Sequence, residues 1–125
     1  MKFQPDTLAG TNAITRFEGS RLWVGATLHE ASVLVPWRGN VLPWPPATAT
    51  DLAAGHFEQI LALQPELVIY GSGARLVFPP AALARVLFER RVGLETMDTA
   101  AACRTYNVLA AEGRTVVAAL ILPRP

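Results

Sequence analysis

Two continuous apolar segments of strand length place the strongest constraint on how this chain folds. Residues 66–71 (ELVIYG) form the first, and residues 114–122 (RTVVAALIL) close the chain with the second. A strand that does not alternate between apolar and polar positions is expected when both faces of its sheet are covered. We therefore expect covering layers on both sides of the sheet, and helices are the usual layers in such folds.

The segments around these strands carry the spacing and the boundary residues of helices. Thr50 or Asp51 can cap a first helix, which Pro65 stops. A second helix follows the two prolines of FPP and ends in arginines, which interact favourably with the helix dipole. A third helix begins at the cap-type residue Asp98 and ends at a glycine, and residues 92–97 (VGLETM) form a strand before it.

The first part of the chain predicts strands rather than helices. Residues 13–37 contain three apolar stretches, broken at residues 18–20 and at Gly25, which predicts three short strands joined by tight turns. Residues 38–50 contain three prolines and form a rigid connection without helix. The predicted order is β-β-β-α-β-α-β-α-β, a layered α/β fold in a single domain of residues 1–125. We expect a mixed sheet with parallel pairs and right-handed crossovers, and the early meander at one edge or in its own layer.

Size and charge argue against several classes of protein. A chain of 125 residues buries enough apolar surface for one core. Eleven basic and ten acidic residues give a net charge of +1, which is too small for binding a phosphate backbone, so no nucleic acid partner is expected. The longest apolar run, residues 116–122, is far shorter than a membrane span. No apolar segment precedes Pro5 and Asp6, so we find no secretory signal and expect a cytoplasmic location.

Few residues suit redox, metal or covalent chemistry. Cys103 is the only cysteine, which excludes an internal disulfide and a multi-cysteine metal site. The two histidines, His29 and His56, lie far apart in the sequence, which argues against a zinc site. Ser72 has no histidine nearby, and Cys103 lies in a predicted helix among alanines, where a buried, inert thiol is expected. We predict no catalytic residue, no metal site and no cofactor.

A first candidate site follows the strand of residues 66–71, where Gly71, Ser72, Gly73 and Arg75 come in quick succession. Ligands of α/β folds usually bind at such a strand-to-helix edge, where glycines let backbone N–H groups approach an anion. The spacing matches neither G-x-G-x-x-G nor a P-loop, and an apolar segment and two prolines precede the helix. The alternative is that both glycines supply positive φ in a tight turn, and this interpretation is favoured.

A second group of polar residues begins at the same edge of the sheet. Its members are Asp98, Thr99, Arg104, Tyr106 and Asn107. Arg104 and Asn107 are three residues apart and therefore share a helix face. A carboxylate, a guanidinium and an amide on adjacent elements can bind a polar group, but they can equally hold the strand ends together. For Asp98 the role of helix cap is favoured.

Trp37 and Trp44 lie on or near the ends of the proline-rich connection. Each indole can fill the domain's own core, which is the commoner role. Each can instead anchor a protein partner, because tryptophan is enriched in interface hot spots. The core interpretation is favoured.

Several ordered segments make the chain similar to a known family. They are ITRFEG, VLVPW, DLAAGHFEQILALQPELVIYGSGAR, FPP and MDTAAACRTYNVLAAEGR. Together they resemble the Mth938-like family, also called DUF498, over about residues 14–122. That family includes bacterial proteins of unknown function and, more distantly, the mitochondrial complex I assembly factor 3. The first strands depart from the family pattern at Phe17 and Trp23, where relatives commonly place glycines and a tyrosine.

The resemblance implies a compact α/β/α fold on a mixed sheet and no established catalytic activity. For the mitochondrial relatives it implies a role in protein assembly. The signature positions are Gly71, Gly73, Arg75, Asp98, Thr99, Arg104, Tyr106 and Asn107, followed by the segment Glu112, Gly113 and Arg114.

Two hypotheses about function follow. The first is a non-enzymatic binding or assembly module whose protein partner docks at the sheet edge formed by residues 71–75 and 98–107. The second is an enzyme or sensor for a small anionic ligand, which Arg75 and Arg104 would hold in a cleft beside Asp98.

Overall fold

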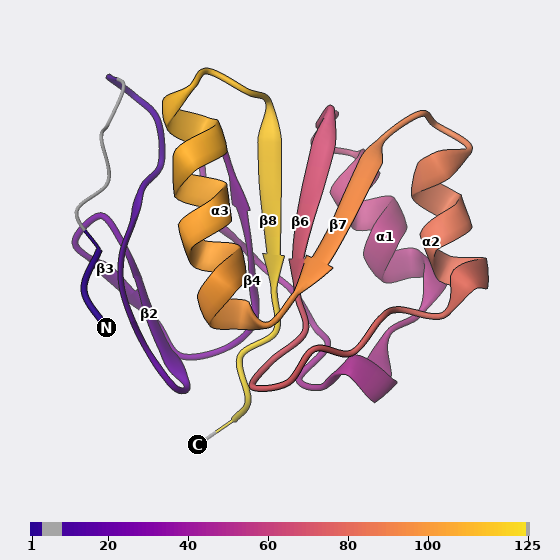
Figure 1. The fold of residues 1–125 in the computed structure, drawn as a ribbon, viewed down its shortest axis with the longest axis horizontal. Coiled ribbons are helices and arrows are strands. Elements are labelled where there is room, and N and C mark those ends of the chain that lie inside the picture. Colours follow the sequence, from indigo (N-terminus) through magenta and orange to yellow (C-terminus); the bar gives the residue numbers. More distant parts are fainter. Residues whose placement is uncertain (4–8, 125) are drawn as a thin grey trace.

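The computed structural model describes residues 1–3 and 9–124 of the chain (Figure 1). It contains a mixed sheet, a smaller antiparallel sheet and three α-helices arranged in layers. Pro5 and Asp6, on which the prediction about a secretory signal depends, lie outside the described residues.

The mixed sheet has the strand order β5-β4-β8-β6-β7. Strand β6 is parallel to both of its neighbours, β7 and β8, whereas β4 is antiparallel to β8 and to β5. All residues of the central strand β8 are buried, as its continuous apolar sequence predicted. The strands are β4 (Val33–Pro36), β5 (Leu42–Pro43), β6 (Leu67–Gly71), β7 (Gly93–Met97) and β8 (Val116–Leu120).

Helices cover both faces of this sheet, which confirms the predicted fold class. Helix α3 (Thr99–Ala111) lies on one face, and helices α1 (Ala54–Leu61) and α2 (Ala81–Phe88) lie on the other (Figure 1). Successive residues of β6 therefore enter different cores: Ile69 packs with α3, while Val68 packs with α1 and α2. Within the described part of the chain, no helix is both long and apolar enough to cross a membrane.

The early meander forms a layer of its own. It consists of β1 (Ile14–Glu18), β2 (Arg21–Val24) and β3 (Thr27–His29), paired in sequence order as antiparallel strands. Ile14 and Leu22 are fully buried in the same core as Tyr106 of α3. Helix α3 consequently lies between the two sheets and has apolar neighbours on both sides.

The structure differs from the sequence-based prediction in the number of early strands. Residues 13–37 contain four strands instead of three, and the proline-rich connection contributes the two-residue β5. After β3 the chain leaves the small sheet and joins the mixed sheet as β4. Ser32 lies at this crossing, where it is buried and its Oγ accepts a hydrogen bond from the N–H of Leu122 at 2.9 Å. This contact, distant in sequence, lies at the break between β3 and β4.

The first helix also begins later than predicted. Residues Ala49–Asp51 form a 3-10 turn, and α1 starts at Ala54. The carboxylate of Asp51 accepts hydrogen bonds from the backbone N–H groups of Ala47 and Thr48, each at 3.1 Å. Asp51 therefore caps the short turn that precedes α1 and does not cap α1 itself.

Trp44 belongs to the core, as favoured from the sequence. Its side chain is 2% exposed and packs near the rings of Phe57 and Tyr70. Its indole Nε1 donates a hydrogen bond to the carbonyl of His56 at 3.2 Å, so the polar atom is satisfied. Trp37 is half-buried and touches both cores.

Two side chains of α3 bond to backbone in or next to the first strand: Asn107 binds β1, and Tyr106 binds the segment before it and β4. The amide of Asn107 donates to the carbonyl of Ile14 and accepts from the N–H of Ile14, both at 2.8 Å. The hydroxyl of Tyr106 lies 2.9 Å from the carbonyl oxygen of Asn12 and 3.0 Å from that of Pro36. The side-chain amide of Asn107 thus pairs with the backbone of Ile14 as a neighbouring strand would, and it satisfies both backbone groups at a buried position.

We expect Asn107→Ala to lower the free energy of unfolding by about 2–4 kcal/mol, because both buried backbone groups of Ile14 lose their partner. Urea denaturation monitored by far-UV circular dichroism measures the change. Arg104→Ala, an exposed position on the same helix, is the control and should change the value by less than about 0.5 kcal/mol. Equal effects of the two substitutions would contradict this account of the small sheet's attachment.

Candidate functional site

The carboxyl ends of β6 and β7 meet the start of α3, as the sequence predicted. The N–H of Gly73 donates to Oγ1 of Thr99, and the N–H of Thr99 donates to the carbonyl of Gly73, both at 2.9 Å. The hydroxyl of Thr99 donates in turn to the carbonyl of Ile121, just beyond β8, at 2.9 Å. Thr99 is 1% exposed, so its hydroxyl joins three elements inside the fold and is closed to solvent.

Gly71 and Gly73 are required for different reasons. Gly73 has φ +104°, which is the backbone conformation that the turn interpretation predicted. Gly71 is outside the positive-φ region, so that interpretation is wrong for it. A Cβ at Gly71 would lie 2.9 Å from Cα of Thr99 and 3.0 Å from its Oγ1. Gly71 therefore permits the start of α3 to approach the end of β6.

Ser72 supports the loop that leaves β6. Its Oγ donates to the carbonyl of Arg75 at 2.6 Å and accepts the N–H of Val77 at 2.9 Å. The same oxygen lies 3.3 Å from the carbonyl of Met97. Ser72 is 6% exposed, and these contacts occupy its hydroxyl. They make the loop a defined structure although it contains neither helix nor strand.

A small cleft of about 160 Å³ lies at this edge, and its lining is mainly apolar. Asp98 is one of the lining residues, and its carboxylate accepts the N–H of Ala101 at 2.9 Å, which confirms the predicted helix cap. Neither Arg75 nor Arg104 borders the cleft. The cleft is lined by Phe17, Gly19, Gly73, Ala74, Asp98, Thr99, Ala100, Ile121 and Pro123. The lining thus contains one acidic residue and no arginine, which does not suit binding of an anion.

The structure brings together only part of the predicted set of polar residues. Gly71, Ser72, Gly73, Asp98 and Thr99 meet at the sheet edge. Arg75 is exposed, and in the described residues it forms no ion pair.

The later members of the set lie elsewhere on α3. Arg104 is exposed, and its Nη1 lies 3.6 Å from Sδ of Met1. Tyr106 and Asn107 are buried against the small sheet, so Arg104 and Asn107 occupy different environments despite their spacing. Arg75, Asp98 and Arg104 therefore neither pair with one another nor surround one cleft.

Sequence reasoning missed the side chains that follow Arg75. Leu76, Val77 and Phe78 are 54%, 44% and 70% exposed, respectively. Three consecutive large apolar side chains in one exposed loop exceed the scattered single residues that are normal on a surface. The available signal was an apolar segment that belongs to no predicted strand or helix and stands between Arg75 and two prolines.

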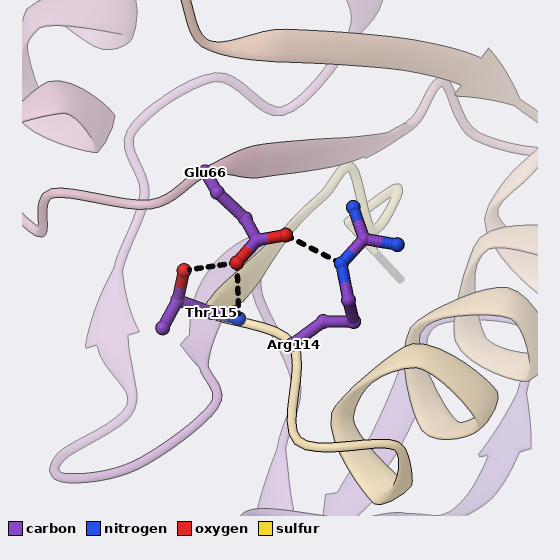
Figure 2. Close-up of polar contacts among 3 residues, drawn as sticks. All are labelled: Glu66, Arg114 and Thr115. Atoms are coloured by element: carbon purple, nitrogen blue, oxygen red, sulfur yellow. Dashed lines mark hydrogen bonds and ion pairs between the residues drawn. The ribbon is translucent and has the colours of Figure 1, made fainter.

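At the amino ends of β6 and β8, a polar contact of Arg114 holds the two strands together (Figure 2). The carboxylate of Glu66, just before β6, accepts a hydrogen bond from Nε of Arg114. Its second oxygen accepts from Oγ1 of Thr115 at 2.9 Å and from the N–H of Thr115 at 3.3 Å. The hydrogen bond from Arg114 and then those from Thr115 lower the pKa of Glu66.

Cys103 is fully buried, as expected for an inert thiol. Burial raises the pKa of its thiol to about 12, so the nucleophilic thiolate does not form at neutral pH.

Comparisons with known proteins identify a family. The model of a family described as "Protein of unknown function (DUF498/DUF598)" matches residues 14–121. An uncharacterised protein of Rhodobacter capsulatus is 41% identical over 101 residues, which cover 81% of this chain and 71% of that protein. NADH dehydrogenase (ubiquinone) 1 alpha subcomplex assembly factor 3 of Bos taurus is 34% identical over 86 residues. That match covers 67% of this chain but 47% of the assembly factor, so the chain spans about half of its length.

Solved structures share the fold. A crystal structure of a Bordetella parapertussis protein has a TM-score of 0.86 and 33% identity, covering 93% of this chain and 99% of that one. A solution structure from Bordetella pertussis, described as a Mth938-like domain, has a TM-score of 0.84 and 28% identity. It covers 99% of this chain and 94% of the other.

Gly71→Ala should lower the free energy of unfolding by about 1–3 kcal/mol, because the new methyl group meets the backbone of Thr99. Gly55→Ala is the matched control: the space around Gly55 in α1 is open, and the change should raise stability by up to about 1 kcal/mol. Chemical denaturation measures both variants. Opposite signs are expected, and a stabilising Gly71→Ala would contradict the close approach of α3.

The contact of Glu66 predicts a defined pH dependence. A carboxyl group whose pKa is lower in the folded state adds stability above its unfolded pKa, and this contribution disappears as pH falls through the folded pKa. Glu66→Gln should therefore destabilise the protein at neutral pH and become equivalent to the parent chain in acid. Unfolding curves over a pH series measure this difference. Glu112→Gln, whose carboxylate forms no ion pair in the described residues, is the control and should have a smaller effect at neutral pH.

Proposed function

The chain belongs to the DUF498, or Mth938-like, family, and on this premise we propose that it is a non-enzymatic protein-binding module of the assembly-factor type. Members of the family are named as assembly factors of NADH dehydrogenase, which supports an assembly-type role in the family. The chain matches about half of the length of those proteins, so we do not propose their whole role for it. We propose only that it binds a partner. The partner is another protein.

The docking element in this proposal is the loop of residues 75–78, and the observation that carries it is the exposure of Leu76, Val77 and Phe78. The hydroxyl of Ser72 fixes the start of the loop, and two prolines follow it. A rigid loop loses little conformational entropy when it binds. The apolar side chains therefore hold a defined position before the partner binds.

Burial of these side chains would contribute part of the binding free energy. Removing one large apolar side chain from water contributes about 1.5–3 kcal/mol. The most exposed of the three, Phe78, is an aromatic anchor of the kind that dominates interface energies. Arg75 stands beside the apolar side chains as an exposed cation. The expected partner surface is an apolar groove with an acidic group at its rim.

The cytoplasmic location stays a prediction. Fractionation of the native cell, followed by detection of the protein in each fraction, tests it.

The double substitution Leu76→Ser with Phe78→Ser should remove partner binding while leaving the fold intact, because both side chains are exposed. Affinity capture from the native cell with quantitative mass spectrometry is the measurement. The parent chain should recover a stoichiometric protein partner, and the double variant should recover at least about tenfold less of it. Val108→Ser, which changes an exposed apolar residue of α3, is the matched control and should recover the parent amount.

Two results would count against the proposal. One is the repeated absence of a stoichiometric partner, and the other is equal capture by the parent chain and the double variant. A small anion that raises the melting temperature of the parent chain but not of Arg75→Ala would favour the ligand-binding hypothesis instead.

A further inference from the structure

Strand β7 is an edge of the mixed sheet whose outer side is open. It pairs with β6 on one side, and no other strand of the described residues pairs with it. Helix α3 lies mainly over β6 and β8 and contacts β7 little, whereas α2 packs against the opposite face of β7 (Figure 1). Glu95, at the centre of the strand, is exposed although its neighbour on β6, Ile69, is fully buried.

Two backbone hydrogen bonds at the ends of β7 fix which of its backbone groups face outward. The N–H of Gly93 donates to the carbonyl of Glu66, and the carbonyl of Met97 accepts the N–H of Ser72. In a parallel pair, alternate residues direct both backbone groups toward the same neighbouring strand. Leu94 and Thr96 therefore point their N–H and C=O groups away from β6. These four groups form a template on which a further strand can pair.

The other edges of the two sheets are closed or short. Edge strand β5 has two residues, one of which is Pro43 and lacks an N–H. The outer side of β1 is occupied by the N-terminal residues, since the N–H of Phe3 donates to the carbonyl of Thr15 and the N–H of Phe17 donates to that of Met1. Strand β3 has three residues. By contrast, β7 has five residues and no proline.

Charged residues around β7 indicate the chemistry of a partner strand. Arg90 and Arg91 lie in the turn before the strand, and Arg85 lies on α2, which packs beside it. All three are exposed, and none forms an ion pair among the described residues. The exposed Glu89 precedes Arg90 in the same turn, so the charge at this end is net positive. An incoming segment thus passes basic side chains at the amino end of β7 and a carboxylate, that of Glu95, at its centre.

The same charges disfavour a second copy of this chain as the occupant. Antiparallel pairing of two β7 strands through Leu94 and Thr96 would place Glu95 directly opposite the same residue of the other copy. Like charges at directly opposed positions destabilise a sheet. Glu95 thus protects this edge against self-association, in the way charged residues protect other natural edge strands.

We infer that the outer edge of β7 binds an extended segment of a partner protein as an added strand. The segment carries acidic residues at the end that passes Arg90 and Arg91, and a basic or neutral residue opposite Glu95. Main-chain hydrogen bonds to Leu94 and Thr96 supply affinity, and the charges set the register. This surface is separate from the loop of residues 75–78, and a partner protein can use both.

The test selects binders from a library of random dodecapeptides displayed on phage, with the parent chain as bait. Enriched peptides should contain a stretch that favours β-structure with acidic residues at one end. Thr96→Pro removes the outward N–H of β7 without removing a bond to β6, and it should weaken binding of these peptides about tenfold. Thr96→Val keeps that N–H and is the matched control, with parent affinity expected. The double substitution Arg90→Ala with Arg91→Ala should weaken the binding of the acidic peptides. Added salt should reduce the difference in affinity between this variant and the parent chain.

Hydrogen exchange keeps the test decisive if Thr96→Pro fails to fold. In the free parent chain, the amide protons of Leu94 and Thr96 should exchange fast. When a selected peptide is bound, the same protons should exchange slowly. The loop variant Leu76→Ser with Phe78→Ser should keep peptide binding, which separates this inference from the proposed function. The inference is overturned if no peptide is enriched, if binding is unchanged in Thr96→Pro, or if slowed exchange maps elsewhere. A concentration-dependent dimer of the parent chain that Thr96→Pro abolishes would overturn it in favour of self-pairing.

Discussion

The shared position of α3 between two sheets is the constraint on which the rest of the structure depends. A helix with sheets on both sides must bury apolar side chains around most of its circumference and must satisfy polar groups on both neighbours. Thr99 bonds the ends of β6 and β8, and Asn107 bonds the backbone of β1. The approach is close enough that a glycine is required at position 71. Contacts of this one helix therefore connect the small sheet, the mixed sheet and the carboxyl ends of β6 and β8.

This constraint is consistent with the burial of several polar candidate residues. Ser72, Thr99 and Asn107 are buried, and their polar atoms bond to the protein itself. Arg114, near the amino ends of β6 and β8, likewise bonds to Glu66. The groups that remain available to a partner are of another kind. They are the apolar side chains of the loop, the unpaired backbone of β7 and several arginines, which suit contact with another protein better than the chemistry of a small molecule.

Much of the fold was predictable because it rests on local patterns. The apolar run of β6 predicted coverage on both faces, and Asp98 predicted the start of α3, since both features depend on neighbouring residues alone. The predictions that differed from the structure concern how segments end, which the local pattern left open. At the break between β3 and β4, Ser32 bonds to Leu122, a residue far away in the sequence. Before α1, Asp51 caps a separate short turn through bonds to Ala47 and Thr48, and α1 starts only at Ala54.

The sequence by itself determined the strand and helix types, the layered arrangement and the family, because periodicity, caps and ordered motifs are properties of nearby residues. It also identified the edge at which β6 meets α3. Only the tertiary structure decided what each residue at that edge does. Arg104 and Asn107 share a spacing, yet one is exposed and the other is buried, because the small sheet covers only part of α3. The direction of a side chain relative to a distant layer is fixed by packing, and spacing along the chain does not specify it.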